Sequence, residues 1–505
     1  MTNLNEIVST LSPEDQRHFI MYLERKNTRS DTKNIQLFKL LLKNELNSND
    51  VCLKLYKSNK KDAYHALRKR LYQSIIDFIA NSSLEEDKVV DMQIIKYVLA
   101  ARTFLLHKQY KVAFNILERA ETMAAENNLF PLLNEIYHTK IQYAYATPTL
   151  KLDELIEKFK TNQKYYHQED RLNIAYAKIR ESINEVTVKR QFINFQKLVT
   201  DTLKEYDIDM TESMSFMSLY QLMKIVTISA FASNDYLKVE PFLKNTYEIL
   251  LTHKNKEKQL YYHLQVLNII AYTLFRNKKF DESLTFLEQQ YELMKQKKGK
   301  YYNEFKLKYH LILALNLNFR GHQDQAILTL KPFINSKHTD LESLLDIHLS
   351  LVMMYFQKGD FQNARQIFSK FYHTDKWYIE KADIEWVIKK NLIEILLHIE
   401  LKNVDLVESR LLSFRRNYSK FLKDIKQQRA ITYLNLVNEY FNAPEKITTV
   451  AFKNKVENSF EWIGGKQEDI FVMSFYAWLK SKMENKPLFL TTLYLIKTVQ
   501  ETNES

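Results

Sequence analysis

Apolar side chains recur every three or four residues along most of the chain, a spacing that places them on one face of an α-helix. Residues 60–80 give a clear example, because Tyr64, Leu67 and Leu71 are separated by polar positions. Helix-start signals accompany the pattern. At Ser12-Pro13-Glu14-Asp15 a capping serine precedes a proline at the first helical position, which predicts a helix from there to about Arg25.

The first part of the chain is predicted to be a helical module of its own. Its further helices are expected over residues 35–43, 50–56 and 60–80. A polar stretch over residues 81–87 then marks a boundary, so residues 1–85 are interpreted as an N-terminal helical module.

Residues 351–368 combine an apolar helix, a Gly-Asp-aromatic turn and a second helix headed by a small residue. This segment resembles a tetratricopeptide repeat. The residues that fill the positions of the family pattern are Val352, Tyr355, Gly359, Phe361, Ala364 and Phe368. The resemblance implies antiparallel helix pairs that stack into an α/α superhelix, with small residues where two helices cross closely.

Weaker copies of the same pattern recur along residues 90–445. Their turn positions are Tyr110, Tyr236, Phe280, Gln323 and Val404, and Phe361 is the turn position of the clear copy. From Tyr236 onward these turn markers lie 38 to 44 residues apart, compared with about 34 residues in the standard repeat. The longer gap before Tyr236 leaves room for two faint repeats near Leu152 and Asn194.

The predicted fold class is therefore all-α, a TPR-like solenoid with an added N-terminal module. Residues 86–445 are assigned to the helical repeats, and residues 446–505 to helices that cap the last repeat. Within that cap, helices are expected to end near Ile463, to cover 466–483 and to cover 487–500, with a break at Gly464-Gly465.

Composition supports this assignment. The chain of 505 residues has only 5 glycines and 7 prolines, whereas average usage would give about 35 and 25. Such a chain lacks the turn residues that β-sandwiches and doubly wound sheets need at each connection. The enrichment in Lys, Asn, Ile and Tyr is typical of AT-rich bacterial genomes.

Charge and cysteine content bear on the kind of partner and on the cellular compartment. A net charge of +12 is spread over the whole length and favours acidic partners only modestly. The single cysteine, Cys52, excludes an intramolecular disulfide and is consistent with a reducing compartment. Neither a signal-peptide pattern nor a membrane-length apolar run is evident, so a cytoplasmic protein without membrane association is expected.

Patterns for catalysis or cofactors are missing from the sequence. Gly464-Gly465 lacks the Lys-Ser or Lys-Thr pair that follows in a phosphate-binding loop. Glu135 and His138 have the spacing of one half of a di-iron site, but the second copy is absent. Cys52 has no histidine nearby in the sequence. The prediction is a non-enzymatic protein with no metal or cofactor.

A basic helix in the N-terminal module offers one binding surface. Its candidate contacts to nucleic acid are Lys60, Lys61, His65, Arg68, Lys69 and Arg70. Preceded by a short helix and a turn, residues 60–72 are compatible with the second helix of a helix-turn-helix, although a solvated basic face is the simpler interpretation. The order of parts is similar to that of peptide-sensing bacterial regulators, which join a DNA-binding module to a TPR-like solenoid.

The inner face of the solenoid offers the other surface. The resemblance implies that the first helix of each pair lines it, with Asn268, Tyr272, Phe275, Arg276, Lys308, Leu315, Met353, Phe356 and Leu396 as candidate partner contacts. These are mainly apolar, unlike the Asn and Lys residues of the family's carboxylate clamp. Two alternatives follow: a groove for an apolar segment of a protein or peptide partner, or a face buried within the solenoid or by self-association. The expected function is a scaffold for such a partner, with a nucleic-acid-associated regulator as the alternative.

Overall fold

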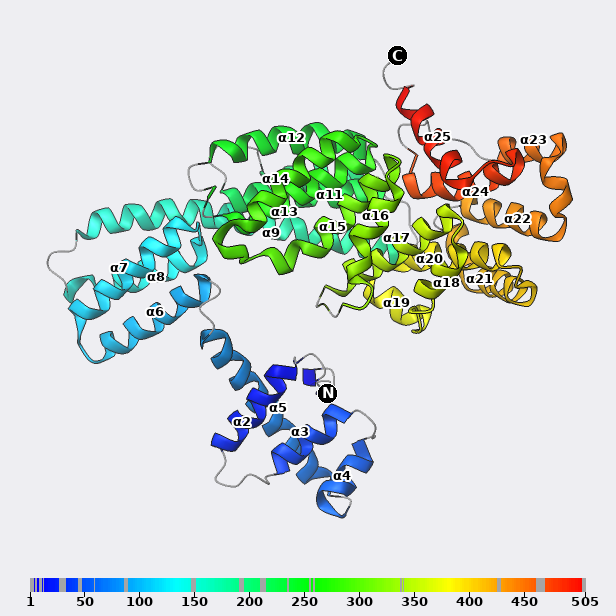
Figure 1. The fold of residues 1–505 in the computed structure, drawn as a ribbon. Helices are drawn as coiled ribbons and strands as arrows, with labels where there is room; N and C mark the ends of the chain where they lie inside the picture. Colours follow the sequence, from blue (N-terminus) through cyan, green and yellow to red (C-terminus); the bar gives the residue numbers. More distant parts are fainter. Residues whose placement is uncertain are drawn as a thin grey trace. The chain divides into compact units, whose positions relative to one another are not determined.

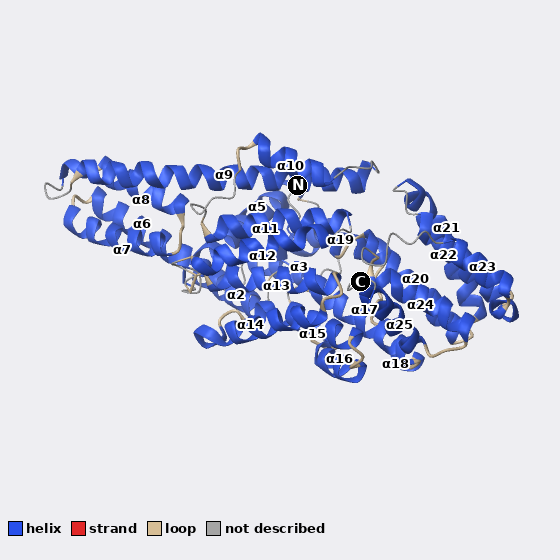
Figure 2. Cartoon of the chain, turned by 90° about the horizontal axis from the view of Figure 1, so that it is seen from above, coloured by secondary structure: helices blue, strands red, loops and turns tan. Residues whose placement is uncertain are grey.

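Helices form all the regular structure in the described part of the chain, and no strand occurs there (Figure 2). The computed structural model describes residues 4, 7–8, 11, 13–26, 33–43, 48–58, 60–85, 90–146, 151–189, 195–208, 215–233, 236–253, 256–257, 259–336, 338, 340–424, 428–459 and 468–501. The predicted all-α fold class is confirmed. The chain divides into two compact units, Met1–Asn162 and Gln163–Ser505.

The first unit begins with four helices, which correspond to the four predicted ones. They are α2 (Pro13–Lys26), α3 (Lys33–Lys43), α4 (Ser48–Tyr56) and α5 (Lys61–Glu85). Their buried faces share a core of their own, in which Phe19 packs edge-on against Phe38 with ring centroids 4.8 Å apart. Cys52 lies in this core as a buried free thiol. The predicted helix start at Pro13 is confirmed.

Three further helices complete the regular structure of this unit before a long one begins. They are α6 (Val90–Leu106), α7 (Tyr110–Glu126) and α8 (Phe130–Gln142), followed by the 3-10 helix η1 (Ala144–Ala146) and by α9 (Leu152–Lys189). Ala101 of α6 and Ala113 of α7 are completely buried. Small side chains at these positions let the two helices approach closely.

The second unit is built from consecutive helix pairs. After α10 (Phe195–Glu205), the pairs are α11 (Phe216–Ser233) with α12 (Tyr236–Thr252), α13 (Leu260–Arg276) with α14 (Phe280–Gly299), α15 (Tyr302–Phe319) with α16 (Gln323–Leu330), α17 (Leu341–Lys358) with α18 (Phe361–Phe368), and α20 (Ile384–Glu400) with α21 (Val404–Asp424). The short elements η2 (Lys331–Phe333) and α19 (Asp375–Lys381) lie between pairs. Ala364 of α18, the predicted small residue, is completely buried.

The first helices of successive pairs pack against one another and form what we call the A layer, α11, α13, α15, α17 and α20 (Figure 1). Each second helix packs against its own partner, and α14, α16 and α18 also contact the first helix of the next pair. This packing of adjacent pairs is compatible with a helical repeat protein.

The turns between paired helices agree with the markers taken from the sequence. All six markers are the first residue of a helix: Tyr110, Tyr236, Phe280, Gln323, Phe361 and Val404. Two residues before five of these markers the backbone is left-handed, at Lys108, Lys278, Gly321, Gly359 and Lys402. A left-handed residue ends the first helix and reverses the chain. Leu152 begins α9, whereas Asn194 lies outside the described residues.

The C-terminal helices do more than cover the last pair. They are α22 (Gln428–Asn442), η3 (Pro444–Thr448), α23 (Val450–Ser459), α24 (Ile470–Glu484) and α25 (Leu488–Glu501); the expected break at Gly464-Gly465 and the expected end near Ile463 lie outside the described residues. Helix α24 runs past the C-terminal ends of A-layer helices. Ser474 accepts a hydrogen bond from Gln357 of α17, and the Trp478 indole donates one of 2.6 Å to Glu400 of α20.

Candidate functional site

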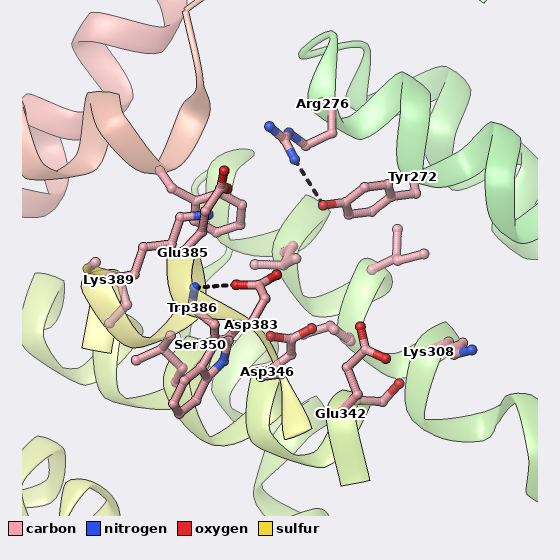
Figure 3. Close-up of a pocket in the computed structure, with 18 of the residues that line it drawn as sticks. Tyr272, Arg276, Lys308, Glu342, Asp346, Ser350, Asp383, Glu385, Trp386 and Lys389 are labelled. Carbon is pink, nitrogen blue, oxygen red and sulfur yellow. Dashed lines mark hydrogen bonds between the residues drawn. The ribbon is translucent and has the colours of Figure 1, made fainter. Parts of the chain in front are cut away.

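A pocket of about 370 Å³ lies on the A layer of the second unit (Figure 3). Helices α13, α15, α17 and α20 contribute its walls, and α24 closes one side with Phe471 and Phe475. The pocket therefore sits where four successive repeats and the C-terminal segment meet. A site on several rigid helices holds its side chains in fixed relative positions.

Six of the nine inner-face residues predicted from the sequence line this pocket: Asn268, Tyr272, Arg276, Lys308, Leu315 and Met353. The other three, Phe275, Phe356 and Leu396, are at most 1% exposed and belong to the hydrophobic core. Each α-helical residue is rotated by about 100° from its neighbour, so Phe275 points away from the face that Arg276 presents. Phe356 packs instead against Phe361 in the turn, with ring centroids 5.5 Å apart.

Arg276 is not available to a ligand, because its guanidinium already has several partners. It forms an ion pair with Asp469, the N-cap residue of α24, and donates hydrogen bonds to the hydroxyls of Tyr272 (3.0 Å) and Tyr236 (3.2 Å). Burial alone would raise the pKa of Asp469, but Arg276 and Lys389 hold it below the usual value. Arg276 thus anchors α24 beside the pocket.

A neighbouring lysine reinforces that anchor. Lys278, in the left-handed turn after α13, is 2% exposed and donates a hydrogen bond of 2.8 Å to the backbone carbonyl of Glu468. Burial lowers the pKa of Lys278 to about 8. Two cationic side chains of one repeat therefore hold the start of α24.

Four carboxylates on α17 and at the start of α20 line the pocket: Glu342, Asp346, Asp383 and Glu385. Asp383 caps α20 by accepting a hydrogen bond of 2.6 Å from the backbone N–H of Trp386. Among the described residues, no ion pair involves Glu342, Asp346 or Glu385. The pocket thus contains acidic groups without a cationic partner.

Confinement in the pocket changes the proton affinity of these groups. Burial raises the pKa of Asp346 to about 7, and the neighbouring Glu342 adds to the shift. The Glu342 and Glu385 side chains remain open to solvent at one end, yet the pocket walls remove part of their hydration and raise their pKa as well. Lys389 and the Trp386 side chain therefore compensate the charge of an ionised Asp346 only in part.

The remaining walls are aromatic and apolar, with two lysines at the edge. Lys308 lies 4.0 Å from Asp340, and the Lys389 ammonium lies 5.1 Å from the centroid of the Phe471 ring. Trp386 is 6% exposed, and its indole N–H makes no regular hydrogen bond, although it lies near enough to Asp346 to lower the pKa of that carboxyl. Apolar contacts come from Leu311, Ile312, Leu315, Leu349 and Met353.

The acidic residues were missed in the sequence analysis, although a signal for them exists. Glu342, Asp346, Leu349 and Met353 follow one another at intervals of three or four residues, which places them on one face of α17. If the inner face of α17 is followed from Met353 toward the N-terminus of the helix, the next carboxylates on it are those of Asp346 and Glu342.

A second cavity of about 360 Å³ between α18, α20 and α21 is chemically different. Asp375 accepts hydrogen bonds from Lys390 (2.9 Å) and from the Tyr418 hydroxyl (2.7 Å), and Arg410 pairs with Glu394 at 2.8 Å. Its charged groups already compensate one another. This network serves the packing of the repeats.

The other sequence candidates lie in the first unit. On and before α5, the residues Lys60, Lys61, His65, Lys69 and Arg70 are exposed, whereas Arg68 is half-buried and lies over the Tyr64 ring. Glu135 forms an ion pair with Arg102. No cluster of potential metal ligands occurs among the described residues.

No protein-family model matches the chain, and no curated protein sequence matches it significantly. Within the described part, every helix is too short or too polar to cross a membrane.

Proposed function

We propose that the chain is a TPR-like scaffold that binds a segment of a protein or peptide partner in the A-layer pocket. The observation that carries this proposal is an open pocket in whose walls the apolar side chains of Leu311, Leu349 and Met353 are partly exposed, beside carboxylates that form no ion pair among the described residues. A bound ligand would stabilise side chains of both kinds, because it would remove apolar surface from water and could form charged hydrogen bonds with the carboxylates.

The composition of the pocket favours binding over catalysis. Neither histidine nor cysteine lines it, and its serines, Ser343 and Ser350, have no histidine among the lining residues to activate them. Cradling a chain segment requires only shape, apolar contact and a few polar groups, all of which the A layer provides. The proposal therefore assigns a binding role without a chemical step.

The two alternatives for the inner face both find support. Phe275, Phe356 and Leu396 are core residues, and α24 covers the C-terminal ends of the A-layer helices. Tyr272 and Met353, in contrast, are partly exposed and line the open pocket, and the buried Leu315 lies in its wall. We propose that the partner occupies this uncovered part alone.

A peptide-display selection tests the proposal. Seven-residue peptides would be selected on the intact chain, on Leu311→Trp, which fills the pocket, and on Leu328→Trp as a control. Leu328 lies on α16, is 65% exposed and does not line the pocket. We expect the wild type and the control to enrich the same peptides and Leu311→Trp to lose them. Enrichment by all three proteins alike would contradict the proposal.

We propose one alternative, nucleic-acid association through α5. It is supported by the exposure of Lys60, Lys61, His65, Lys69 and Arg70, which leaves their charges free to approach phosphates. The exposed Asp62 on the same helix reduces the local positive charge. The salt-dependence experiment described in the Discussion tests this alternative.

A further inference from the structure

We propose that the A-layer pocket recognises a basic side chain, a lysine or arginine of the bound peptide, which lies between Glu342 and Asp346 while neighbouring apolar residues of the peptide contact the walls. This inference rests on the proposed function and specifies its ligand. It is supported by charge complementarity between the carboxylates of the pocket and a basic side chain.

The cations already present in the pocket are occupied elsewhere. Arg276 is paired with Asp469, Lys308 faces Asp340 at 4.0 Å, and Lys389 lies over the Phe471 ring. The carboxylates Glu342 and Asp346 form no ion pair among the described residues, although Lys308 lowers the pKa of Glu342 and Lys389 that of Asp346 from a distance. An incoming cation would therefore complete the site, whereas an incoming carboxylate or phosphate would face the Glu342 carboxylate and, above about pH 7, the ionised Asp346 as well.

The surroundings of Asp346 suit an ammonium or a guanidinium group. Asp346 and Glu342 lie one helical turn apart on α17 and project into the same space in Figure 3. The ring of Tyr272 and the indole of Trp386 belong to the same walls, and aromatic faces attract cations. The indole N–H of Trp386, which makes no regular hydrogen bond, is in place to donate to an ionised Asp346.

Proton linkage supports the same ligand. Without a cation, Asp346 retains its proton up to about pH 7, because burial and Glu342 disfavour its charge. A bound ammonium would compensate that charge, so binding would release a proton and strengthen as the pH rises from 6 to 8. The charged groups that face Asp346 and contribute to this balance are Glu342, Lys308, Asp383, Glu385, Lys389 and Arg276.

The experiment uses an array of amidated peptides in which leucines flank one fully varied central position, and each peptide is made both with an acetylated and with a free amino terminus. The full-length protein is compared with Glu342→Gln/Asp346→Asn, and with Glu288→Gln as a charge control on the exposed face of α14. We expect Lys or Arg at the centre to bind about tenfold more tightly than Gln or Glu, a preference worth roughly 1.4 kcal/mol. The double variant should lose this preference and the control should keep it.

Four results would overturn the inference. A wild type that prefers neutral or acidic centres, or a basic preference that survives in the double variant, would overturn the charge assignment alone. Binding of no array peptide by the wild type, together with no peptide selected by display, would overturn the proposed function as well. A fourth result would be tighter binding of peptides with a free amino terminus than of acetylated ones, without a preference for any residue at the central position. It would show that the pocket binds the terminal amine of the peptide and not a basic side chain.

Discussion

Arg276, the last residue of α13, forms a buried ion pair with Asp469, the residue that caps α24, and the two lie 193 positions apart in the chain. Their side chains are only 6% and 9% exposed. The pair ties the C-terminal segment to the repeats beside the pocket. Arg276 also balances the charge of the Asp469 carboxylate at the N-terminus of α24. This carboxylate accepts hydrogen bonds from the backbone N–H groups of Phe471 and Val472.

Breaking this pair should destabilise the fold strongly. We expect Arg276→Met to lower the free energy of unfolding by about 3 to 5 kcal/mol, because the Asp469 carboxylate stays buried without its cation. Urea denaturation followed by circular dichroism measures the loss. The control is Arg320→Met, since Arg320 pairs with Asp281 at 2.8 Å but the two side chains are 38% and 83% exposed. That change should cost less than about 1 kcal/mol, and equal losses would contradict the anchoring role.

Asp346 should lower stability at neutral pH. Its pKa rises from 3.8 in water to about 7 in the folded chain, so between these values the folded chain holds a proton that the unfolded chain releases. The free energy of unfolding therefore falls as the pH rises through this window. We expect Asp346→Asn to stabilise the chain at pH 8 by on the order of 2 kcal/mol and to have little effect at pH 4.

Thermal and urea unfolding at pH 4, 6 and 8 would test this expectation, with Glu288→Gln as the exposed control. A stabilisation by Asp346→Asn that is the same at all three pH values would show that the change acts through packing. In that case the proton linkage assigned to the pocket would be wrong.

The left-handed turns predict opposite effects for two substitutions. Gly359 has φ +81° with open space around its Cβ position, so Gly359→Ala should lose about 1 kcal/mol through backbone strain alone. Lys402 adopts φ 58° at the equivalent turn, so Lys402→Gly should gain up to about 1 kcal/mol. Chemical denaturation of both variants measures the effects. Losses of similar size in both would contradict the equivalence of these turns.

The basic face of α5 can be tested by its salt dependence. If it binds phosphates, Lys69→Ala/Arg70→Ala should weaken binding of a fluorescent DNA duplex and reduce the slope of log K against log salt concentration by about one to two. The control is Lys108→Ala, an exposed cation outside this face. We expect no specific complex at about 150 mM salt. A nanomolar complex under those conditions that the double variant loses would favour nucleic-acid association over peptide binding.

Local features of the fold were predictable from the sequence because their signals are local. A capping serine with Pro13 marks the start of α2, and the turn markers from Phe280 to Val404 coincide with the first residues of helices. Because the pattern repeats along the chain, the alignment of residues 351–368 with the repeat family could be transferred to the neighbouring repeats. That register led to Tyr272, Leu315 and Met353 in the pocket.

Long-range features were not predictable in this way. The contact between Arg276 and Asp469 joins distant segments and has no local pattern, so Arg276 was interpreted as a partner contact although α24 already occupies it. Phe356 was assigned to the groove, but the turn that follows places Phe361 against it. The carboxylates at the start of α17 were overlooked because the family pattern directs attention to the C-terminal half of that helix.

The most direct test of the account is the dissociation constant of one selected peptide, measured by isothermal titration calorimetry. The titration would compare the wild type with Leu311→Trp and Leu328→Trp after thermal unfolding has shown that all three are folded. We expect Leu311→Trp to bind the peptide more than about tenfold more weakly than the wild type, a loss of binding free energy above roughly 1.4 kcal/mol. We expect Leu328→Trp to bind it with unchanged affinity. Equal affinity of all three proteins for the peptide would contradict the claim that the A-layer pocket is the binding site.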